Sequence, residues 1–337
     1  MGHGGKGINT PLDSALLPTV LLLFGVLMFG KSWNPDGLHA YVTGGSTGLG
    51  LSLAIILASK GAHVSIVARN QYRLDNALKA IEKCRQHPNQ LLAVYSFSLN
   101  TAVESAAALE AVCKPHGGNS PDAVFACAGS SKPKFFMEMS EEEMEQGMIN
   151  GYWVQAWTVM AAAKKMVRDG SKGKIVLVSS TLGYMSFIGW ASYSPAKHAL
   201  RGLADTLQSE FMLYDIDIHI FFPPTMFTPG YDEENKTKPP IVRDIESTDD
   251  GMTADAAANA LFRGIQKGHT HITGDIITDL FRASTRGAAP RHNMFLDTLY
   301  DMAASIIAPI WRMGVDKRVR AHRVEHLQYL HDNGFFS

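Results

Sequence analysis

The hydrophobic and polar positions alternate in short runs that are separated by helical patterns. Residues 38–42 and 63–69 alternate between apolar and polar side chains and predict two strands, whereas residues 51–58 repeat apolar positions with helical spacing. Residues 173–180 form a continuous apolar run, which is typical of a strand buried in a parallel sheet, and a helical pattern follows at residues 196–211. Strands that alternate with helices predict an α/β protein with a doubly wound parallel sheet.

A glycine-rich turn, TGGSTGLG, joins the first predicted strand to the first predicted helix. In that position such a turn binds the diphosphate of a dinucleotide. Gly44 permits the tight turn, while Gly48 and Gly50 let the backbone and the helix N-terminus approach the pyrophosphate. Ser46 and Thr47 add hydroxyl donors. The same letters also fit an ordinary glycine-rich loop, but the flanking strand and helix favour a Rossmann-type dinucleotide site.

Two arginines near the end of the second predicted strand bear on the choice of cofactor. An NAD site places an acidic residue about 20 positions beyond the glycine turn, against the ribose 2′-hydroxyl. No acidic residue occurs between Gly50 and Asp75, whereas Arg69 ends the strand and Arg73 lies one helical turn later. Two guanidinium groups suit a 2′-phosphate, so we expect NADPH, or NADP+ in the oxidised form. The alternative is a solvated basic pair that opens a surface helix.

Tyr193 and Lys197 stand four residues apart at the start of a helical segment, so they share one face. A free phenol has a pKa of about 10 and donates its proton weakly. A nearby ammonium and an oxidised nicotinamide favour the phenolate and lower that pKa. We therefore expect Tyr193 to act as general acid in reduction and as general base in oxidation. Ser180, at the end of the buried strand, would stabilise negative charge on a carbonyl oxygen, with the adjacent Ser179 as the alternative.

Together with Cys-Ala-Gly at residues 127–129 and with Asn150, these motifs resemble the short-chain dehydrogenase/reductase family over roughly residues 38–275. The resemblance implies that Asn150 supports a proton-relay water. It also implies that the turn from Pro223 to Thr228, after the sixth strand, binds the carboxamide of the nicotinamide.

Two positions depart from the family pattern. Cys127 stands where the fourth strand commonly ends with asparagine, and Ser98 stands where the third strand usually ends with an aspartate that contacts adenine. The expected catalytic residues are Asn150, Ser180, Tyr193 and Lys197. The expected cofactor-binding residues are Gly44, Ser46, Thr47, Gly48, Leu49, Gly50, Arg69, Arg73, Ser98, Leu99, Ala128, Gly129, Tyr193, Lys197, Pro223, Thr225 and Thr228.

Residues 221–239 and 192–210 resemble a narrower group within that family, the 3-ketodihydrosphingosine reductases. This resemblance implies reduction of a long-chain ketosphingoid substrate with NADPH, at the endoplasmic reticulum membrane and with the catalytic domain facing the cytosol. We expect a membrane lipid surface as a further partner, and a homodimer or homotetramer. Two alternatives stay open: a retinol or steroid dehydrogenase of the same family, and a catalytically silent NADPH-binding membrane adaptor.

The two chain ends carry apolar segments outside the expected catalytic domain at residues 33–280. Residues 1–32 contain 17 consecutive uncharged residues, the short limit for a membrane span, and predict an anchor. A secretory signal and a buried helix are the alternatives. The C-terminal extension, residues 281–337, includes an apolar stretch with aromatic and basic flanks at residues 295–323. That pattern fits a helix lying in a membrane interface, with core packing or a subunit contact as the alternative.

Composition narrows the classes of function. The net charge of the 337 residues is −1, which gives no case for nucleic acid as a partner. Cys84, Cys113 and Cys127 are scattered along the chain, so we expect free thiols. His-x-x-Glu-His, from His322 to His326, matches a zinc-peptidase pattern, but it lies in a basic helical stretch near the C-terminus. We expect a solvated helical face there, and no metal.

Overall fold

The computed structural model describes residues 33–247 and 249–336. The hydrophobic segment that the sequence predicts at residues 1–32 lies outside the described residues. The compact unit Pro35–Ser337 contains the helices and strands described here.

Seven parallel strands form one sheet in the order β3-β2-β1-β4-β5-β6-β9. Their bounds are β1 His39–Thr43, β2 His63–Ala68, β3 Leu92–Ser96, β4 Ala123–Ala126, β5 Gly173–Val178, β6 Ile216–Phe222 and β9 His271–Thr273. Ile175, Val176 and Leu177 of β5 are fully buried, as expected of a central parallel strand with helices on both faces.

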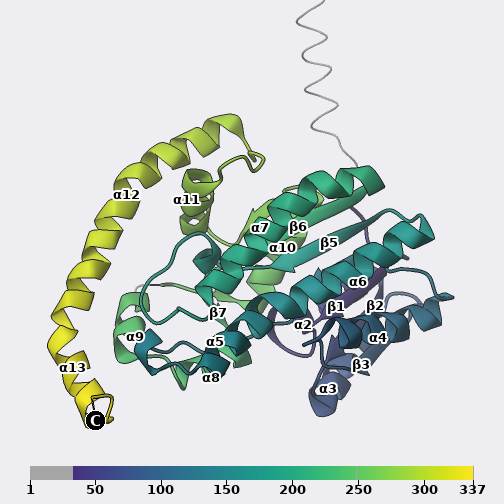
Figure 1. The fold of residues 1–337 in the computed structure, drawn as a ribbon. Helices are drawn as coiled ribbons and strands as arrows, with labels where there is room; N and C mark the ends of the chain where they lie inside the picture. The colour runs from purple at the N-terminus through teal and green to yellow at the C-terminus, as the bar shows by residue number, and fades with distance from the viewer. Residues whose placement is uncertain (1–32, 248, 337) are drawn as a thin grey trace, which may run out of the picture. The chain divides into compact units, whose positions relative to one another are not determined.

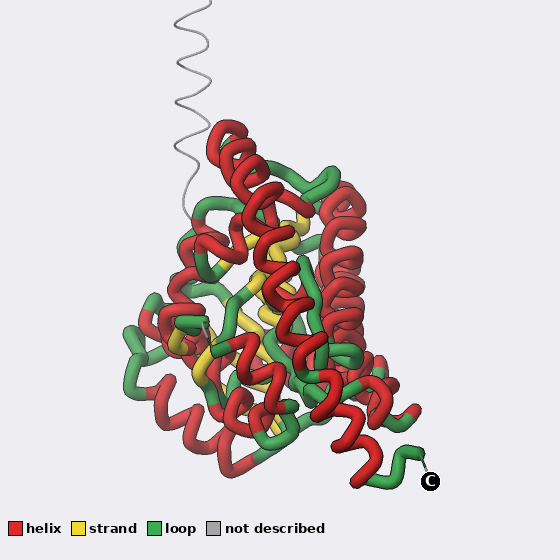
Figure 2. Tube along the Cα trace, turned by 90° about the vertical axis from the view of Figure 1, so that its left-hand side faces the viewer, coloured by secondary structure: helices red, strands yellow, loops and turns green. Residues whose placement is uncertain are grey.

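Helices cover both faces of the sheet, as Figures 1 and 2 show. Helices α2, α3 and α10 lie together on one face, and α4, α6 and α7 lie on the other. Their bounds are α2 Gly48–Ser59, α3 Gln71–Glu82, α4 Ala102–Cys113, α6 Val154–Asp169, α7 Ser194–Glu210 and α10 Ala254–Gln266. The predicted doubly wound α/β fold is confirmed.

The strand order reverses between β1 and β4. These two neighbours are in register at Val42 with Phe125 and at Thr43 with Ala126, so both end at the same edge of the sheet. A ligand of an open α/β sheet binds in the crevice outside the carboxyl ends of the strands at such a reversal. The glycine turn leaves β1 at this edge, and Cys127 follows β4 there.

The remaining helices and two short strands stand over this edge of the sheet. They are α5 Glu141–Met148, β7 Met226–Phe227, α8 Pro229–Asn235, α9 Pro240–Glu246, β8 Met252–Thr253, α11 Ile276–Thr285, α12 Met294–Ala321 and α13 Arg323–Asp332. Strands β7 and β8 form a separate two-stranded sheet. Within residues 33–247 and 249–336, no helix combines the length and the apolar character that crossing a membrane requires.

Helix α12 is continuous over 28 residues, with Pro309 inside it, and curves along one side of the unit (Figure 1). It is tied to α11 by a buried ion pair, in which the Arg282 guanidinium donates to both Asp297 oxygens at 2.6 and 3.1 Å. Further along, Trp311 and Val315 pack against the buried cluster that includes Val242 of α9. The C-terminal extension therefore belongs to the same compact unit as the sheet, and its inner face is close to the carboxyl edge of the sheet.

Candidate active site

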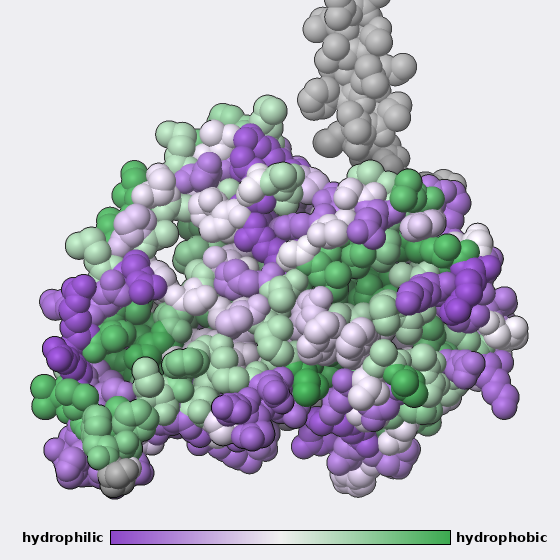
Figure 3. All heavy atoms as spheres, in the orientation of Figure 1, coloured by the Kyte–Doolittle hydropathy of each residue, from purple (hydrophilic) through white to green (hydrophobic). Residues whose placement is uncertain are grey.

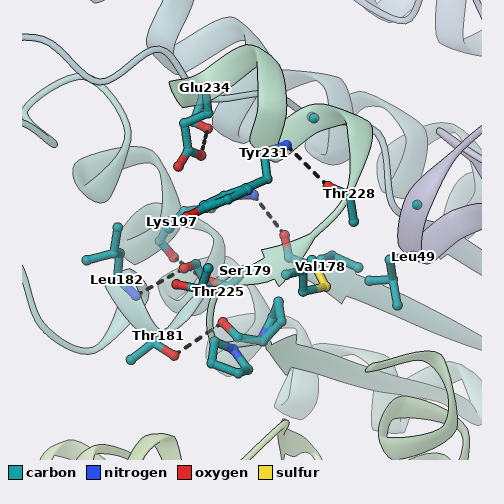
Figure 4. A pocket seen from close by; sticks show the side chains of 18 of the residues that line it. Leu49, Val178, Ser179, Thr181, Leu182, Lys197, Thr225, Thr228, Tyr231 and Glu234 are labelled. Carbon is teal, nitrogen blue, oxygen red and sulfur yellow. Dashed lines mark hydrogen bonds between the residues drawn. The ribbon is translucent and has the colours of Figure 1, made fainter. Parts of the chain in front are cut away.

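A cavity of about 900 Å³ opens at the carboxyl edge of the sheet. It is lined by the turn after β1, by the loops that follow β4, β5 and β6, and by α8, α11 and α12 (Figure 4). All of the expected catalytic and cofactor-binding residues line it, with the single exception of Ser98. The Ser98 hydroxyl instead accepts a hydrogen bond from the Asn100 amide at 3.4 Å, while Phe97, Leu99 and Asn100 line the cavity.

The glycine turn has the shape that a bound diphosphate requires. Gly44 and Gly48 adopt φ angles of +65° and +55°, the left-handed region that favours glycine. A Cβ on Gly44 would lie 2.8 Å from the Ala128 backbone, and a Cβ on Gly50 would lie 2.6 Å from the Gly44 carbonyl oxygen. No side chain caps the N-terminus of α2, so its first amides remain available to an anion at the cavity wall. The residues present therefore fit a dinucleotide cofactor.

Arg69 and Arg73 line the same end of the cavity, after β2. Both are exposed, and neither guanidinium forms a hydrogen bond or ion pair with another residue of the described structure. Arg73 belongs to the first turn of α3, where its backbone amide donates to the Asn70 side chain at 2.9 Å. This cap fixes the start of α3, and both guanidinium groups remain free to bind an anion.

Tyr193 and Lys197 stand at the start of α7, and both line the cavity. Lys197 Nζ lies 5.3 Å from the centre of the Tyr193 ring and donates to the Val178 carbonyl oxygen at 2.9 Å. Gln155, which sequence reasoning missed, holds that part of β5 in place: its amide donates to the same carbonyl at 2.8 Å and accepts from the Val178 amide at 2.9 Å. The lysine is thus positioned by a buried network that joins α6, β5 and α7.

The two adjacent serines after β5 have different surroundings. Ser179 is buried, and its hydroxyl donates to the Lys197 carbonyl oxygen at 3.0 Å, a contact that secures α7. Ser180 is partly exposed at the cavity wall; its hydroxyl accepts a hydrogen bond from the Leu182 amide at 3.2 Å, and its side chain opposes the rise in the pKa of the Tyr193 phenol. The structure therefore brings Ser180, rather than Ser179, to the phenol.

Asn150 lies in a π-helical turn, Ile149–Trp153, between α5 and α6. Such turns are frequent at functional sites because they redirect one stretch of backbone. A Cβ on Gly129 would lie 3.1 Å from the Asn150 carbonyl oxygen and 3.9 Å from Lys197 Nζ, so these groups meet at one point. Gly151 permits this approach, since a Cβ there would lie 2.5 Å from the Ala196 side chain.

Burial shifts the pKa values of both Tyr193 and Lys197. Burial lowers the pKa of Lys197 to about 7. Burial and then the Glu234 carboxylate raise the pKa of Tyr193, against the opposing hydrogen bond from Ser180. Without a bound cofactor the pKa of Tyr193 is thus raised, because desolvation dominates; the lowering expected beside an oxidised nicotinamide stays a prediction. The raised pKa keeps the phenol protonated in the free chain but makes it a weaker acid, so efficient donation requires a bound nicotinamide and Lys197 to lower it.

Comparison with known proteins agrees with this geometry. The model of the short chain dehydrogenase family matches residues 38–239, from β1 to the segment after α8. The chain belongs to the short-chain dehydrogenase family. A family structure from Mycobacterium ulcerans, a short-chain type dehydrogenase/reductase, superposes with a TM-score of 0.62 at 21% identity, over 72% of this chain and 90% of that one. A family enzyme transfers a hydride to or from a nicotinamide, so the dinucleotide site is a nicotinamide cofactor site.

Relatives within the family extend the likeness beyond residue 239. A 3-ketodihydrosphingosine reductase of Cryptococcus neoformans is 41% identical over 97% of this chain and 99% of its own length. Relatives with the same name come from Aspergillus fumigatus, 34% identical over 89% of this chain and 91% of that one, and from Dictyostelium discoideum, 30% identical over 82% and 84%.

Sequence reasoning missed the walls of the cavity that come from distant segments. Glu234 of α8 and Trp190 of the loop before α7 line it near Tyr193. Apolar residues of α11 and α12 line the other end: Ile276, Ile277, Leu280, Phe281, Ala304, Ile307, Ala308 and Trp311. Only the tertiary fold brings these side chains together with the phenol, because up to 118 positions separate them from Tyr193.

The remaining candidate motifs have ordinary structural roles. His322 forms a 2.9 Å contact with Glu325, while the ring of His326 packs 4.2 Å from that of Phe135. Within residues 33–247 and 249–336, no group of three or more potential ligands is placed to hold a metal ion. The three cysteines all belong to the described residues and are free thiols. Burial raises the pKa of Cys127 to about 12, so this thiol at the cavity wall stays protonated.

Proposed function

We propose that the chain reduces 3-ketodihydrosphingosine to dihydrosphingosine with NADPH. The observation that carries the proposal is the extent of the likeness to the named reductases. The family model ends at residue 239, whereas the Cryptococcus relative matches 97% of the chain. The added segment includes α11 and α12, whose apolar side chains line the cavity beyond Tyr193. A long-chain ketone needs both a proton donor and such an apolar wall.

The side chains of the site divide the work of the reduction. A bound nicotinamide would supply the hydride to the carbonyl carbon. Tyr193 Oη donates a proton to the carbonyl oxygen, and the Ser180 hydroxyl donates a hydrogen bond to the same oxygen as negative charge develops on it. Lys197, held by the Val178 carbonyl, lies beside the phenol. Asn150 and Lys197 converge at the Gly129 loop, where a water could return a proton to the phenol.

The preference for NADPH rests on Arg69 and Arg73. Both guanidinium groups are unpaired at the wall of the cavity, and no acidic residue between Gly50 and Asp75 could accept a hydrogen bond from a 2′-hydroxyl. A charge-assisted hydrogen bond to the 2′-phosphate stabilises binding by about 1.5–3 kcal/mol.

Arg69→Ala should therefore raise the Michaelis constant for NADPH about tenfold or more and leave that for NADH nearly unchanged. Steady-state kinetics with both cofactors measure this difference. Arg263→Ala, on the exposed side of α10 and outside the cavity lining, is the matched control and should change neither constant. Equal weakening toward both cofactors would show that Arg69 supports the fold rather than the choice of cofactor.

We also propose that the enzyme works at the surface of the endoplasmic reticulum membrane, with the catalytic unit in the cytosol. Helix α12 supports this, because its outer face exposes Met302, Ile306 and Ile310 while its inner face lines the cavity. Figure 3 shows hydrophobic residues along the first part of α12 and hydrophilic residues near its end. Such a face can lie in a lipid interface, as the sequence predicts. The homodimer or homotetramer stays a prediction.

Deleting residues 1–31 should lower the membrane-bound fraction without unfolding the catalytic unit, which begins at Pro35. In the shortened chain, Ile306→Asp should lower that fraction further, because it places a charge on the outer face of α12, where Ile306 is 66% exposed. Val103→Asp on α4, where the side chain is 80% exposed, is the control and should have no effect. Flotation with vesicles measures the bound fraction. A shortened Ile306→Asp chain that stays fully bound would contradict the role of α12.

A further inference from the structure

The ionisable residues that line the cavity are segregated by charge. Arg69 and Arg73 lie at the end formed by the glycine turn and β2, whereas Lys197 lies beside Tyr193 at the start of α7. The acidic lining residues come from α8 and the segments after it: Glu233, Glu234, Glu246, Asp249, Asp250 and Asp275. The cationic end suits a nucleotide. The acidic residues line the part of the cavity where the substrate must bind, so their negative charge should match a group of the substrate.

Among the acidic lining residues, Glu234 is the one that affects the pKa of the Tyr193 phenol. Its carboxylate is one cause of the raised pKa of Tyr193, so it acts on the phenol through space. One oxygen contacts Lys238 Nζ at 2.7 Å and the other accepts a hydrogen bond from the Ser131 hydroxyl. Figure 4 shows Glu234 and Tyr231 reaching from α8 toward Lys197. A carboxylate has about four acceptor positions, so Glu234 can accept further hydrogen bonds from the cavity.

Lys238 fixes this carboxylate without neutralising the site. It is buried between Glu234 and Glu246, at 2.7 and 2.6 Å, and its ammonium lies 5.3 Å from the Trp190 ring centre and 4.8 Å from that of Tyr231. Although burial opposes it, the hydrogen bonds to the two carboxylates raise the pKa of Lys238, so the ammonium stays charged. Two carboxylates against the Lys238 ammonium formally leave a single negative charge, and Lys197 beside the phenol offsets only part of it, because burial lowers its pKa to about 7.

A second, independent feature points to a polar ligand at the same wall. Trp190 lines the cavity, is 3% exposed, and lies 5.5 Å from the Tyr193 ring, centre to centre. Its indole N–H has no hydrogen-bond partner among the described residues. A buried donor without a partner is costly, so such a group is usually satisfied by a ligand or water. The same wall therefore holds one negative charge and one buried donor without a partner among the described residues.

We infer that Glu234 binds the protonated amino group of the substrate and so selects an amino ketone over a neutral ketone. The inference rests on the proposed function, because in a 3-ketosphingoid the carbon that bears the amino group is bonded to the carbonyl carbon. When Tyr193 contacts the carbonyl oxygen, the ammonium is one carbon away, at the wall where Glu234 lies 2.7 Å from Lys238 Nζ and Lys238 Nζ lies 5.3 Å from the ring centre of Trp190, the neighbour of Tyr193. The hydroxyl on the first carbon is an acceptor for the Trp190 N–H. Lys238 is a positioning residue that holds Glu234.

The test compares 3-ketodihydrosphingosine with the matched 1-hydroxy-3-ketone that lacks only the amino group. For the wild-type enzyme, kcat/KM should be about 10- to 100-fold higher with the amino ketone, the range expected for one charge-assisted hydrogen bond. Glu234→Gln should remove most of that preference, mainly by raising KM for the amino ketone, whereas any change in kcat through the pKa of Tyr193 should be shared by both ketones and leave KM for the neutral ketone nearly unchanged. Trp190→Phe should weaken both ketones, because both carry the hydroxyl.

Asp232→Asn is the matched control, since Asp232 is exposed on the same helix, loses the same charge and does not line the cavity. It should leave both ketones unchanged. If Glu234→Gln does not fold, Glu234→Asp replaces it as the test. That variant keeps the charge, and kcat/KM should fall only for the amino ketone. Equal losses for both ketones in either variant would assign Glu234 a structural role and overturn the inference. Wild-type turnover of both ketones at one rate would overturn it while leaving the function in place. Turnover of neither would instead contradict the proposed function, and the inference with it.

Discussion

Replacing Tyr193 with phenylalanine should lower kcat for ketone reduction by about 10²- to 10⁴-fold, the usual contribution of a positioned general acid. The substitution removes only the hydroxyl, so the ring keeps its contacts with Trp190 and with Lys197 Nζ. The phenol is the group that Ser180 contacts, and its raised pKa keeps it protonated in the free enzyme. Single-turnover kinetics with bound NADPH measure the loss, and the affinity for NADPH should stay close to that of the wild type.

Tyr152→Phe provides the matched control. Tyr152 lies in the π-helical turn next to Asn150 but does not line the cavity, so losing its hydroxyl should leave kcat nearly unchanged. If Tyr193→Phe kept normal turnover, the proton donor would have to be another group. If it abolished turnover but left function in cells intact, the silent NADPH-binding adaptor would replace the reductase.

Asp297→Ala should cost up to about 3–5 kcal/mol of stability, because it leaves the buried Arg282 with Asp279 as its one remaining carboxylate partner in the described structure. Asp297 is 1% exposed, and it accepts from Arg282 at 2.6 and 3.1 Å and from the His292 amide at 3.0 Å. Although burial opposes it, these hydrogen bonds hold the pKa of Asp297 below its ordinary value. The pair joins α11 to α12, so its loss should release α12 and open the apolar wall of the cavity.

Urea unfolding and amide hydrogen exchange over α12 measure this effect. Asp301 lies one turn further along α12 and forms no hydrogen bond in the described structure. Asp301→Ala therefore serves as the control, and its free energy of unfolding should lie within about 0.5 kcal/mol of the wild-type value. The double variant Arg282→Met with Asp297→Leu should recover much of the stability, because it removes the buried charges together. Equal stability of Asp297→Ala and Asp301→Ala would mean that α12 is held by other contacts.

The parts of the site that local sequence specifies were predictable, since a strand, a glycine turn and a helix follow one another and Tyr193 and Lys197 share one turn of a helix. The direction in which the pKa of Tyr193 shifts was not predictable from the sequence. The sequence does not reveal how deeply the phenol is buried, and Glu234, which also raises this pKa, lies 41 positions away along the chain. Ser98 misled for a local reason: β3 ends at Ser96, so the next residues turn and point Phe97 and Leu99 at the cavity instead.

The C-terminal extension shows a second limit of sequence reasoning. A proline inside a helix usually kinks or breaks it, because it has no N–H to donate and its ring crowds the preceding turn, yet α12 runs through Pro309. Contacts at both ends hold the helix: the Arg282–Asp297 pair before Pro309, and Val315 with α9 after it. An apolar stretch that reads as a surface helix thus becomes a wall of the cavity, which only the tertiary packing determines.

The most direct test is turnover of 3-ketodihydrosphingosine by the purified full-length chain, with NADPH and with NADH as cofactor, against retinal and a ketosteroid as comparison substrates. We predict that dihydrosphingosine forms, that kcat/KM is at least about tenfold higher with NADPH than with NADH, and that the comparison substrates react poorly. Efficient turnover of retinal or the ketosteroid, with none of the ketosphingoid, would contradict the proposed function and assign the chain to another activity of the family.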